Sequence, residues 1–183
     1  MTRRRLLRAA AAAAASTVLL LGCATVTPPP FYPGEVLAGR LSVQVAATED
    51  HAASSMTAAF ELRGDAERGR LDLSTPLGST LAQADWSPGR VALTTPRGET
   101  RFESLAALTR EVLGESLPVA ALFDWLRGRP WPGAPSGAPA LPVTHGFSQL
   151  GWTVDLARFD NAAIVAHRPS APAVTVRARV DQP

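Results

Sequence analysis

The sequence predicts a mainly β fold in which roughly nine to eleven short antiparallel strands accompany two helices. Three observations support this prediction. Apolar and polar residues alternate with a period of two over much of the chain after residue 38, turn residues recur between these segments, and two stretches within residues 104–127 have apolar residues at helical spacing. The intervals are too short for parallel crossovers, so we expect an antiparallel meander.

Five segments in the first half of the chain show the alternation or continue it. Each has one apolar and one polar face, as expected for a strand with one side in the core and one in water. Clusters of Gly, Pro and Asp between them predict tight turns. The segments are marked by Leu41, Val43 and Val45; by Met56, Ala58, Phe60 and Leu62; by Leu71 and Leu73; by residues 91–95; and by residues 100–102.

Two short amphipathic helices are expected next. The first begins at Ser104, a residue type that caps helix N-termini, and ends at Gly114, which favours the left-handed C-terminal conformation. The second has Pro118 in its first turn and ends at Gly128. Its apolar residues are expected on one side of the helix, and they are Val119, Leu122, Trp125 and Leu126.

The strands resume after a long loop. Residues 128–142 are rich in Pro and Gly, and we expect this loop to expose Trp131. Residues 152–156 and 174–180 then alternate between apolar and polar, and residues 162–166 are apolar throughout. These three segments complete the predicted sheet.

A sheet of this size twists and curls, and its apolar face needs a cover. Full closure gives a barrel, whereas partial closure around residues 104–127 gives a half-barrel with a helical lid. Either shape can enclose an apolar cavity, although the pattern alone favours a solid core.

The first 22 residues resemble a secretory signal. Arginines precede an apolar run, Ala9–Leu21, that is too short to span a bilayer. The adjoining Leu20-Leu21-Gly22-Cys23 resembles the lipobox of bacterial lipoproteins, which makes Cys23, the only cysteine, the expected lipidation site. The predicted organisation is therefore a signal peptide over 1–22, a Pro-rich tether over 23–37 and a single folded domain over 38–183.

Removal of the signal changes the charge of the chain. The signal holds four of the 18 basic residues and none of the 16 acidic ones, so the formal charge changes from +2 to −2. The remaining arginines are scattered among acidic residues instead of being clustered beside aromatic ones. Nucleic acid is therefore not an expected partner.

Residues with catalytic potential form no recognisable set. The segment 146–151 comes nearest to a nucleophile elbow, but it has one residue too many before its second glycine, and a lipid hydrolase using Ser148 is the catalytic alternative. His51, His145 and His167 lack metal-ligand spacing, and Cys23 is committed to lipid. We therefore expect no enzymatic activity, no metal and no cofactor.

One turn combines polar residues with a bulky apolar one. Pro76-Leu77-Gly78 lies between polar residues and places a leucine at the tip of the turn. Such a leucine either folds back into the core or is exposed. In a protein tethered to a bilayer, an exposed leucine would face the membrane interface.

Several segments together resemble the LolB family of outer-membrane lipoprotein receptors. The most specific is the strand and turn of residues 69–81, Gly-Arg-Leu-Asp-Leu-Ser-Thr-Pro-Leu-Gly-Ser-Thr-Leu. Further matches are Gly39-Arg40-Leu41, the helical residues 117–128 and Gln149-Leu150-Gly151-Trp152, so the resemblance covers nearly the whole chain after the signal. The C-terminus departs from the family because it lacks a Trp-containing end.

The resemblance implies an unclosed antiparallel β-barrel with a helical lid. It also implies a function: the protein accepts lipoproteins from the periplasmic carrier LolA and releases them into the inner leaflet of the outer membrane. The protein would be a monomer, anchored by lipid in the outer membrane and facing the periplasm, with client lipoproteins and membrane lipids as partners. The loop of Pro76, Leu77 and Gly78 would insert into the membrane during delivery, and Ala24 fits outer-membrane sorting.

An apolar cavity would be needed to shield the acyl chains of the cargo, because exposing a sixteen-carbon chain to water costs about 12 kcal/mol. No nucleotide-binding motif is present, so transfer would follow a gradient of affinity. The expected lining is Leu41, Val43, Val45, Met56, Phe60, Leu71, Leu73, Leu122, Trp125, Leu126, Trp152 and Val154. The alternative is a structural outer-membrane lipoprotein with a solid core that acts as a scaffold.

Overall fold

Eleven strands form one antiparallel sheet in the computed structural model, which describes residues 36–49 and 52–182. These residues belong to one unit, Tyr32–Pro183. The predicted signal peptide, Cys23, Ala24 and His51 lie outside the described residues. The elements in order are β1 (Leu37–Val45), β2 (Ser54–Gly64), β3 (Gly69–Ser74), β4 (Thr80–Ser87), β5 (Arg90–Thr95), β6 (Gly98–Phe102), α2 (Leu105–Leu113), α3 (Val119–Trp125), β7 (Ser136–Gly137), β8 (Gly146–Gln149), β9 (Trp152–Asp155), η1 (Phe159–Asn161), β10 (Ala163–Arg168) and β11 (Val174–Val180).

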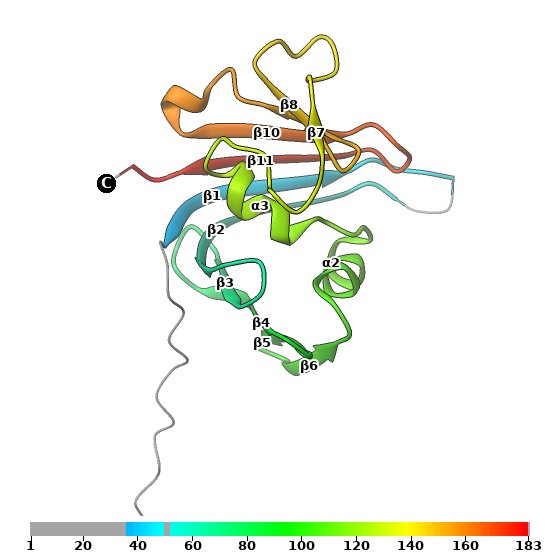
Figure 1. Ribbon diagram of the computed structural model, residues 1–183. Helices are drawn as coiled ribbons and strands as arrows, with labels where there is room; N and C mark the ends of the chain where they lie inside the picture. The colour runs from blue at the N-terminus through cyan, green and yellow to red at the C-terminus, as the bar shows by residue number, and fades with distance from the viewer. Residues whose placement is uncertain (1–35, 50–51, 183) are drawn as a thin grey trace, which may run out of the picture. The chain divides into compact units, whose positions relative to one another are not determined.

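The sheet is open. Its strand order is β6-β5-β4-β3-β2-β1-β11-β10-β9-β8-β7, and the edge strands β6 and β7 do not pair with each other. Helices α2 and α3 lie on one side of it (Figure 1). The predicted unclosed antiparallel barrel with a lid of short helices is therefore confirmed.

The two ends of the folded domain meet in the middle of the sheet. The last strand, β11, pairs with β1 over seven residues, from Gly39↔Val180 to Val45↔Val174. A Cβ atom on Gly39 would lie 2.0 Å from the Arg179 carbonyl oxygen, so this pairing requires a glycine. The C-terminal strand thus pairs fully without the Trp-containing end.

Three strands have no counterpart among the sequence-based expectations. In β4, the small Ala82 and Ala84 occupy inward positions, which weakens the apolar signal. Strand β7 has two residues. Strand β8 forms a hairpin with β9. The two turn residues of this hairpin have positive φ angles, 54° at Leu150 and 77° at Gly151. The segment interpreted as an imperfect nucleophile elbow is therefore a β-hairpin.

Helix α2 has the predicted boundaries. The Ser104 hydroxyl oxygen accepts a hydrogen bond from the Ala107 N–H at 3.1 Å, which caps the N-terminus. At the other end Gly114 has a φ of 80°, and its N–H donates to the Arg110 carbonyl at 2.9 Å. Of its side chains, only those of Leu108 and Thr109 are fully buried.

Helix α3 is shorter and more deeply buried than expected, because it ends at Trp125 and has no exposed residue. The prediction of a single apolar side is wrong. Phe123 packs edge-on against Trp86 of β4 at 5.9 Å between ring centroids, whereas Trp125 packs against Phe147 of β8 at 6.3 Å. The helix contacts strands from both halves of the sheet, so apolar residues are required on more than one side.

The loop after α3 is also less exposed than expected. Trp131 is half-buried and packs against the core, so the prediction of an exposed Trp131 is wrong. Its backbone is held by Gln149, whose amide accepts from the Trp131 N–H at 3.0 Å and donates to the Trp131 carbonyl at 2.7 Å. Sequence composition does not reveal this pairing because Gln149 lies 18 residues away.

Candidate functional site

An apolar cavity of about 90 Å³ lies between α2 and the inner face of the N-terminal half of the sheet. Thr109 supplies the only polar side chain in its lining, and the Thr109 hydroxyl accepts from the Leu117 N–H at 2.9 Å and donates to the Ala106 carbonyl at 3.2 Å. The wall therefore offers no free hydrogen-bonding group to a polar ligand. The lining residues are Leu41, Val43, Met56, Leu71, Leu73, Ala82, Ala84, Leu93, Leu108, Thr109, Val112, Leu113, Leu117, Val119, Leu122 and Val176.

The structure brings six of the twelve expected lining residues together at this cavity. They come from four elements and share an inward position, and they are Leu41, Val43, Met56, Leu71, Leu73 and Leu122. The other lining residues were missed, although Val112 and Leu113 of α2 and Val176 of β11 carry the same periodic signal. This signal indicates an inward position but does not indicate which side chains line a cavity.

The remaining six expected residues do not line the cavity. They are buried at 9% relative exposure or less and pack in the core, and they are Val45, Phe60, Trp125, Leu126, Trp152 and Val154. Several surround Trp125, which is fully buried and lies 6.0 Å from Trp152 between ring centroids. This part of the core is filled by aromatic side chains.

Gln149 holds the aromatic part of the core together. Its side chain is 2% exposed. The carbonyl oxygen accepts from the Trp125 indole N–H at 2.8 Å and from the Trp131 N–H at 3.0 Å, while the amide nitrogen donates to the Trp131 and Ala134 carbonyls at 2.7 and 2.8 Å. All four hydrogen-bonding positions of the amide are used, so α3 and the loop after it are tied to β8.

The segment between the two helices is attached to the sheet by an ion pair. Arg168 of β10 donates to the Glu115 carboxylate at 2.7 Å, and its guanidinium lies 5.5 Å from the Trp152 ring centroid. A weaker contact joins α2 itself, in which the Ser54 hydroxyl donates to the Leu113 carbonyl at 3.4 Å. Polar contacts of this kind contribute about 1 kcal/mol each, so α2 is fastened less firmly than α3.

The turn between β3 and β4 exposes its leucine. Leu77 is 95% exposed. The turn is closed by hydrogen bonds from the Gly78 N–H to the Thr75 carbonyl at 2.9 Å and from the Thr75 N–H to the Ser79 carbonyl at 2.8 Å. Gly78 has a φ of 86°, a conformation that favours glycine. A defined turn, not a loose loop, therefore presents Leu77 to solvent.

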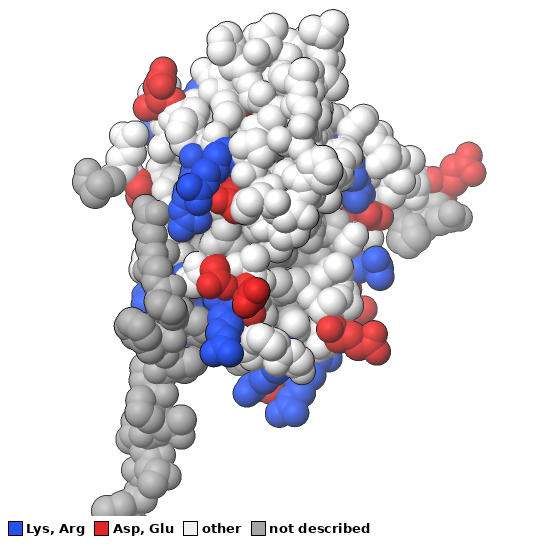
Figure 2. All heavy atoms as spheres, in the orientation of Figure 1, with Lys and Arg blue, Asp and Glu red and all other residues white. Residues whose placement is uncertain are grey.

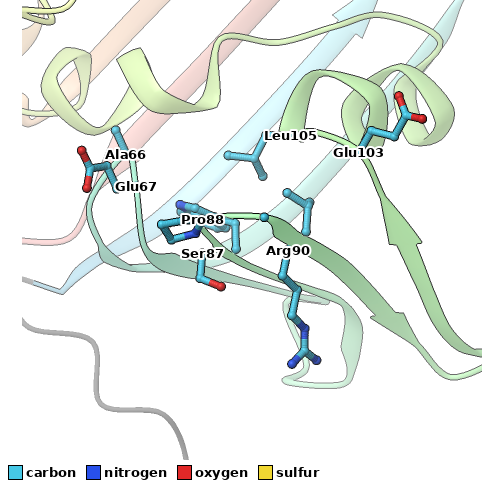
Figure 3. A pocket seen from close by; sticks show the side chains of 10 residues that line it. Ala66, Glu67, Ser87, Pro88, Arg90, Glu103 and Leu105 are labelled. Carbon is cyan, nitrogen blue, oxygen red and sulfur yellow. The ribbon is translucent and has the colours of Figure 1, made fainter.

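A second pocket, of about 310 Å³, lies between the β4–β5 turn and the start of α2. Figure 3 shows that its charged side chains, Glu67, Arg90 and Glu103, point away from one another. The charged side chains that line this pocket do not converge, so we do not take it as the candidate site.

The described residues contain no cluster of His, Cys, Asp and Glu that could hold a metal ion. Ser148 lies in the middle of β8, where it pairs with Gly137 and Thr153. The two described histidines bond elsewhere, His145 to Thr144 and His167 to Thr175. Among the residues that the structure describes, no serine hydrolase arrangement forms around Ser148.

The face that carries the helices has both acidic and basic residues, which are separated by uncharged surface (Figure 2). None of the helices within the described part of the chain has the length and apolar character needed to cross a membrane.

Comparison with known proteins identifies the family. The family described as "Outer membrane lipoprotein LolB" matches residues 36–179. The outer-membrane lipoprotein LolB of Bordetella petrii is 33% identical over 175 residues, which covers 88% of this chain and 86% of the relative. The protein of the same name from Bordetella pertussis is 36% identical over 149 residues, covering 76% and 73%. With its open sheet, its helical lid and this similarity along most of its length, the chain belongs to the LolB family of outer-membrane lipoproteins.

Proposed function

We propose that this protein is a lipid-anchored receptor that accepts lipoproteins from the periplasmic carrier LolA and inserts them into the inner leaflet of the outer membrane. The apolar cavity beneath α2 carries the proposal, because its lining is suited to an acyl chain and to no polar ligand. Cys23 would hold the anchor, and the protein would act as a monomer facing the periplasm. The proposal includes no catalytic step, cofactor or nucleic acid.

The cavity is too small in this structure to hold an acyl chain. Its volume of about 90 Å³ is well below the roughly 300 Å³ at which small-molecule sites begin. Binding of an acyl chain therefore requires the lid to move outward. Helix α2 is suited to this movement because only Leu108 and Thr109 are buried, while Val112 lines the cavity and is still 45% exposed.

Release into the membrane is assigned to Leu77. Moving an exposed leucine side chain into an apolar phase gains about 2 kcal/mol. Because Leu77 is 95% exposed and its turn is closed by backbone hydrogen bonds, inserting it breaks no contact within the protein. Pro76 and Gly78 shape the turn that presents it.

The test of this function measures acceptance and delivery separately. Residues 24–183 are incubated with a LolA–lipoprotein complex, first alone and then with vesicles. We expect Leu77→Glu to accept lipoprotein as the wild type does and to lose most delivery to vesicles, because a charged tip opposes insertion. Its free energy of unfolding, measured in urea, should stay within about 0.5 kcal/mol of the wild type, as for other exposed positions.

Leu141→Glu is the matched control, since Leu141 is 88% exposed on a different loop. Equal loss of delivery in both variants would show that the effect is not specific to the β3–β4 turn. If no lipoprotein moves to the wild-type protein at all, the receptor function is wrong, and a scaffold role would explain the fold better.

A further inference from the structure

The outer face of the central strands, opposite the helices, carries three arginines close together. The buried residues of β1 and β11 point inward, so Arg40, Arg177 and Arg179 lie on the opposite face, and all three are exposed. Arg40 stands directly opposite Arg179 in the β1–β11 register. Like charges in directly opposed positions destabilise a sheet, so this pair weakens the fold unless something negative binds to it.

These arginines also differ from most others in the described residues. Several arginines form ion pairs with carboxylates, among them Arg63, Arg70, Arg90, Arg101, Arg129 and Arg168. Within residues 36–49 and 52–182, none of the three arginines on the outer face has such a partner, although Arg177 donates to the Gln44 side-chain oxygen at 2.7 Å. Within the described residues, these three guanidinium groups therefore lack a carboxylate in direct contact.

A groove of about 570 Å³ is lined by both Arg40 and Arg179. Gly39 and Ala59 contribute little or no side chain to it, while Arg40 and Arg179 contribute two cations. One carboxylate, Asp181, also lines the groove, and it forms no ion pair with either arginine at up to 4.0 Å among the described residues. The remaining lining residues are Asn161, Val180 and Gln182.

The groove lies at the end of the sheet where the chain enters the fold. Strand β1 begins at Leu37, three residues before Arg40, and only residues 24–36 separate it from Cys23. Even a fully extended chain of this length spans at most about 50 Å. If Cys23 is anchored in a bilayer, this end of the sheet cannot leave the neighbourhood of the membrane surface.

We propose that Arg40, Arg177 and Arg179 form a docking surface for anionic phospholipid headgroups of the membrane in which the protein is anchored. The inference rests on the lipid anchor of the proposed function. Phosphate groups match guanidinium groups in charge and in hydrogen-bonding geometry. Near an anionic membrane each arginine shifts the docked population about fivefold, and the attraction weakens with salt.

The experiment uses the lipidated chain in vesicles. Acylation at Cys23 is first verified by mass spectrometry. Because the acylated Cys23 cannot react with a thiol label, Thr57→Cys provides a single labelling site. This site lies on the outer face, opposite Ser42 in the β1–β2 register. A fluorophore at this site is quenched by quencher-bearing headgroups. We expect quenching in vesicles that contain phosphatidylglycerol and little in phosphatidylcholine alone.

The Arg40→Gln/Arg179→Gln variant should lower the docked population about 25-fold. The Arg97→Gln/Arg101→Gln variant removes the same charge from the turn and strand at the β6 edge and should dock as the wild type does. The urea midpoint of the first variant should be unchanged or higher, because the repulsion between opposed arginines is removed. Quenching that is equal in the two vesicle types, or that survives in the first variant, would overturn the docking surface. A chain that is not acylated would instead refute the anchor and, with it, the membrane proximity on which docking rests.

Discussion

The part of the core around α3 and the part beneath α2 are filled in different ways. Around α3, large side chains meet at short distances, as in the contact of Trp125 with Trp152, and Val154 and Ala166 have no exposed surface. Beneath α2, aliphatic side chains from several strands leave a cavity of about 90 Å³. We call these parts the filled half and the hollow half. The same inward-facing strand pattern thus supports two kinds of interior, one suited to stability and one to changes in volume.

The largest effect is expected from removing the amide that organises the filled half. Gln149→Leu leaves the Trp125 indole N–H without its partner and removes the links to Trp131 and Ala134. We expect a loss of about 2–4 kcal/mol in the free energy of unfolding, measured by urea denaturation. Gln44→Leu, at an exposed position with one hydrogen bond to Arg177, should change it by less than about 0.5 kcal/mol. Similar values for the two variants would contradict the role given to Gln149.

A matched pair of valines compares the two halves directly. Val154 is fully buried in the filled half, whereas Val43 is 3% exposed and lines the cavity. We expect Val154→Ala to cost about 1 kcal/mol more than Val43→Ala, because side chains beside an existing cavity have fewer packing contacts to lose. Equal m-values in urea would show that the comparison is valid. A larger cost at Val43 would mean that the hollow half is as tightly packed as the other.

The smallest effect is expected from filling the cavity. Ala82 lines it, and Ala82→Leu should raise the free energy of unfolding by up to about 1 kcal/mol and lower the uptake of a fluorescent acyl probe. Ala166→Leu in the filled half should instead cost about 1–3 kcal/mol, because no space is available there. Unchanged probe uptake in Ala82→Leu would show that the acyl probe does not bind in this cavity.

The strand and helix boundaries were accessible from sequence wherever local chemistry decides them. The alternation in β1 and β2 and the caps of α2 at Ser104 and Gly114 are local signals, and the structure has these elements at the expected positions. Strand β4 was not predicted from the sequence, because the alanines at its inward positions differ little in hydrophobicity from the polar residues at its outward positions.

The sequence does not indicate which part of the core is filled and which part is hollow. Alternation indicates which side chains face inward, but it does not indicate what stands opposite them. Leu71 faces a cavity and Phe60 a packed core, although their strands, β3 and β2, are neighbours with similar patterns. The burial of α3 on several sides and the position of Trp131 likewise depend on contacts with distant residues such as Gln149.

The capping of α2 has a consequence for how a lid can open. Both helix ends are closed by groups that belong to the helix or lie next to it, since Ser104 caps the first turn and the Gly114 N–H bonds to Arg110. Helix α2 can therefore move away from the sheet without unwinding at its ends, provided that residues 114–117 move with it and keep the Leu117 N–H bonded to the Thr109 hydroxyl. The proposed opening then chiefly involves hydration of the cavity wall and loss of the Ser54–Leu113 and Arg168–Glu115 contacts. In the proposed function, an incoming acyl chain would cover the hydrated wall with apolar surface.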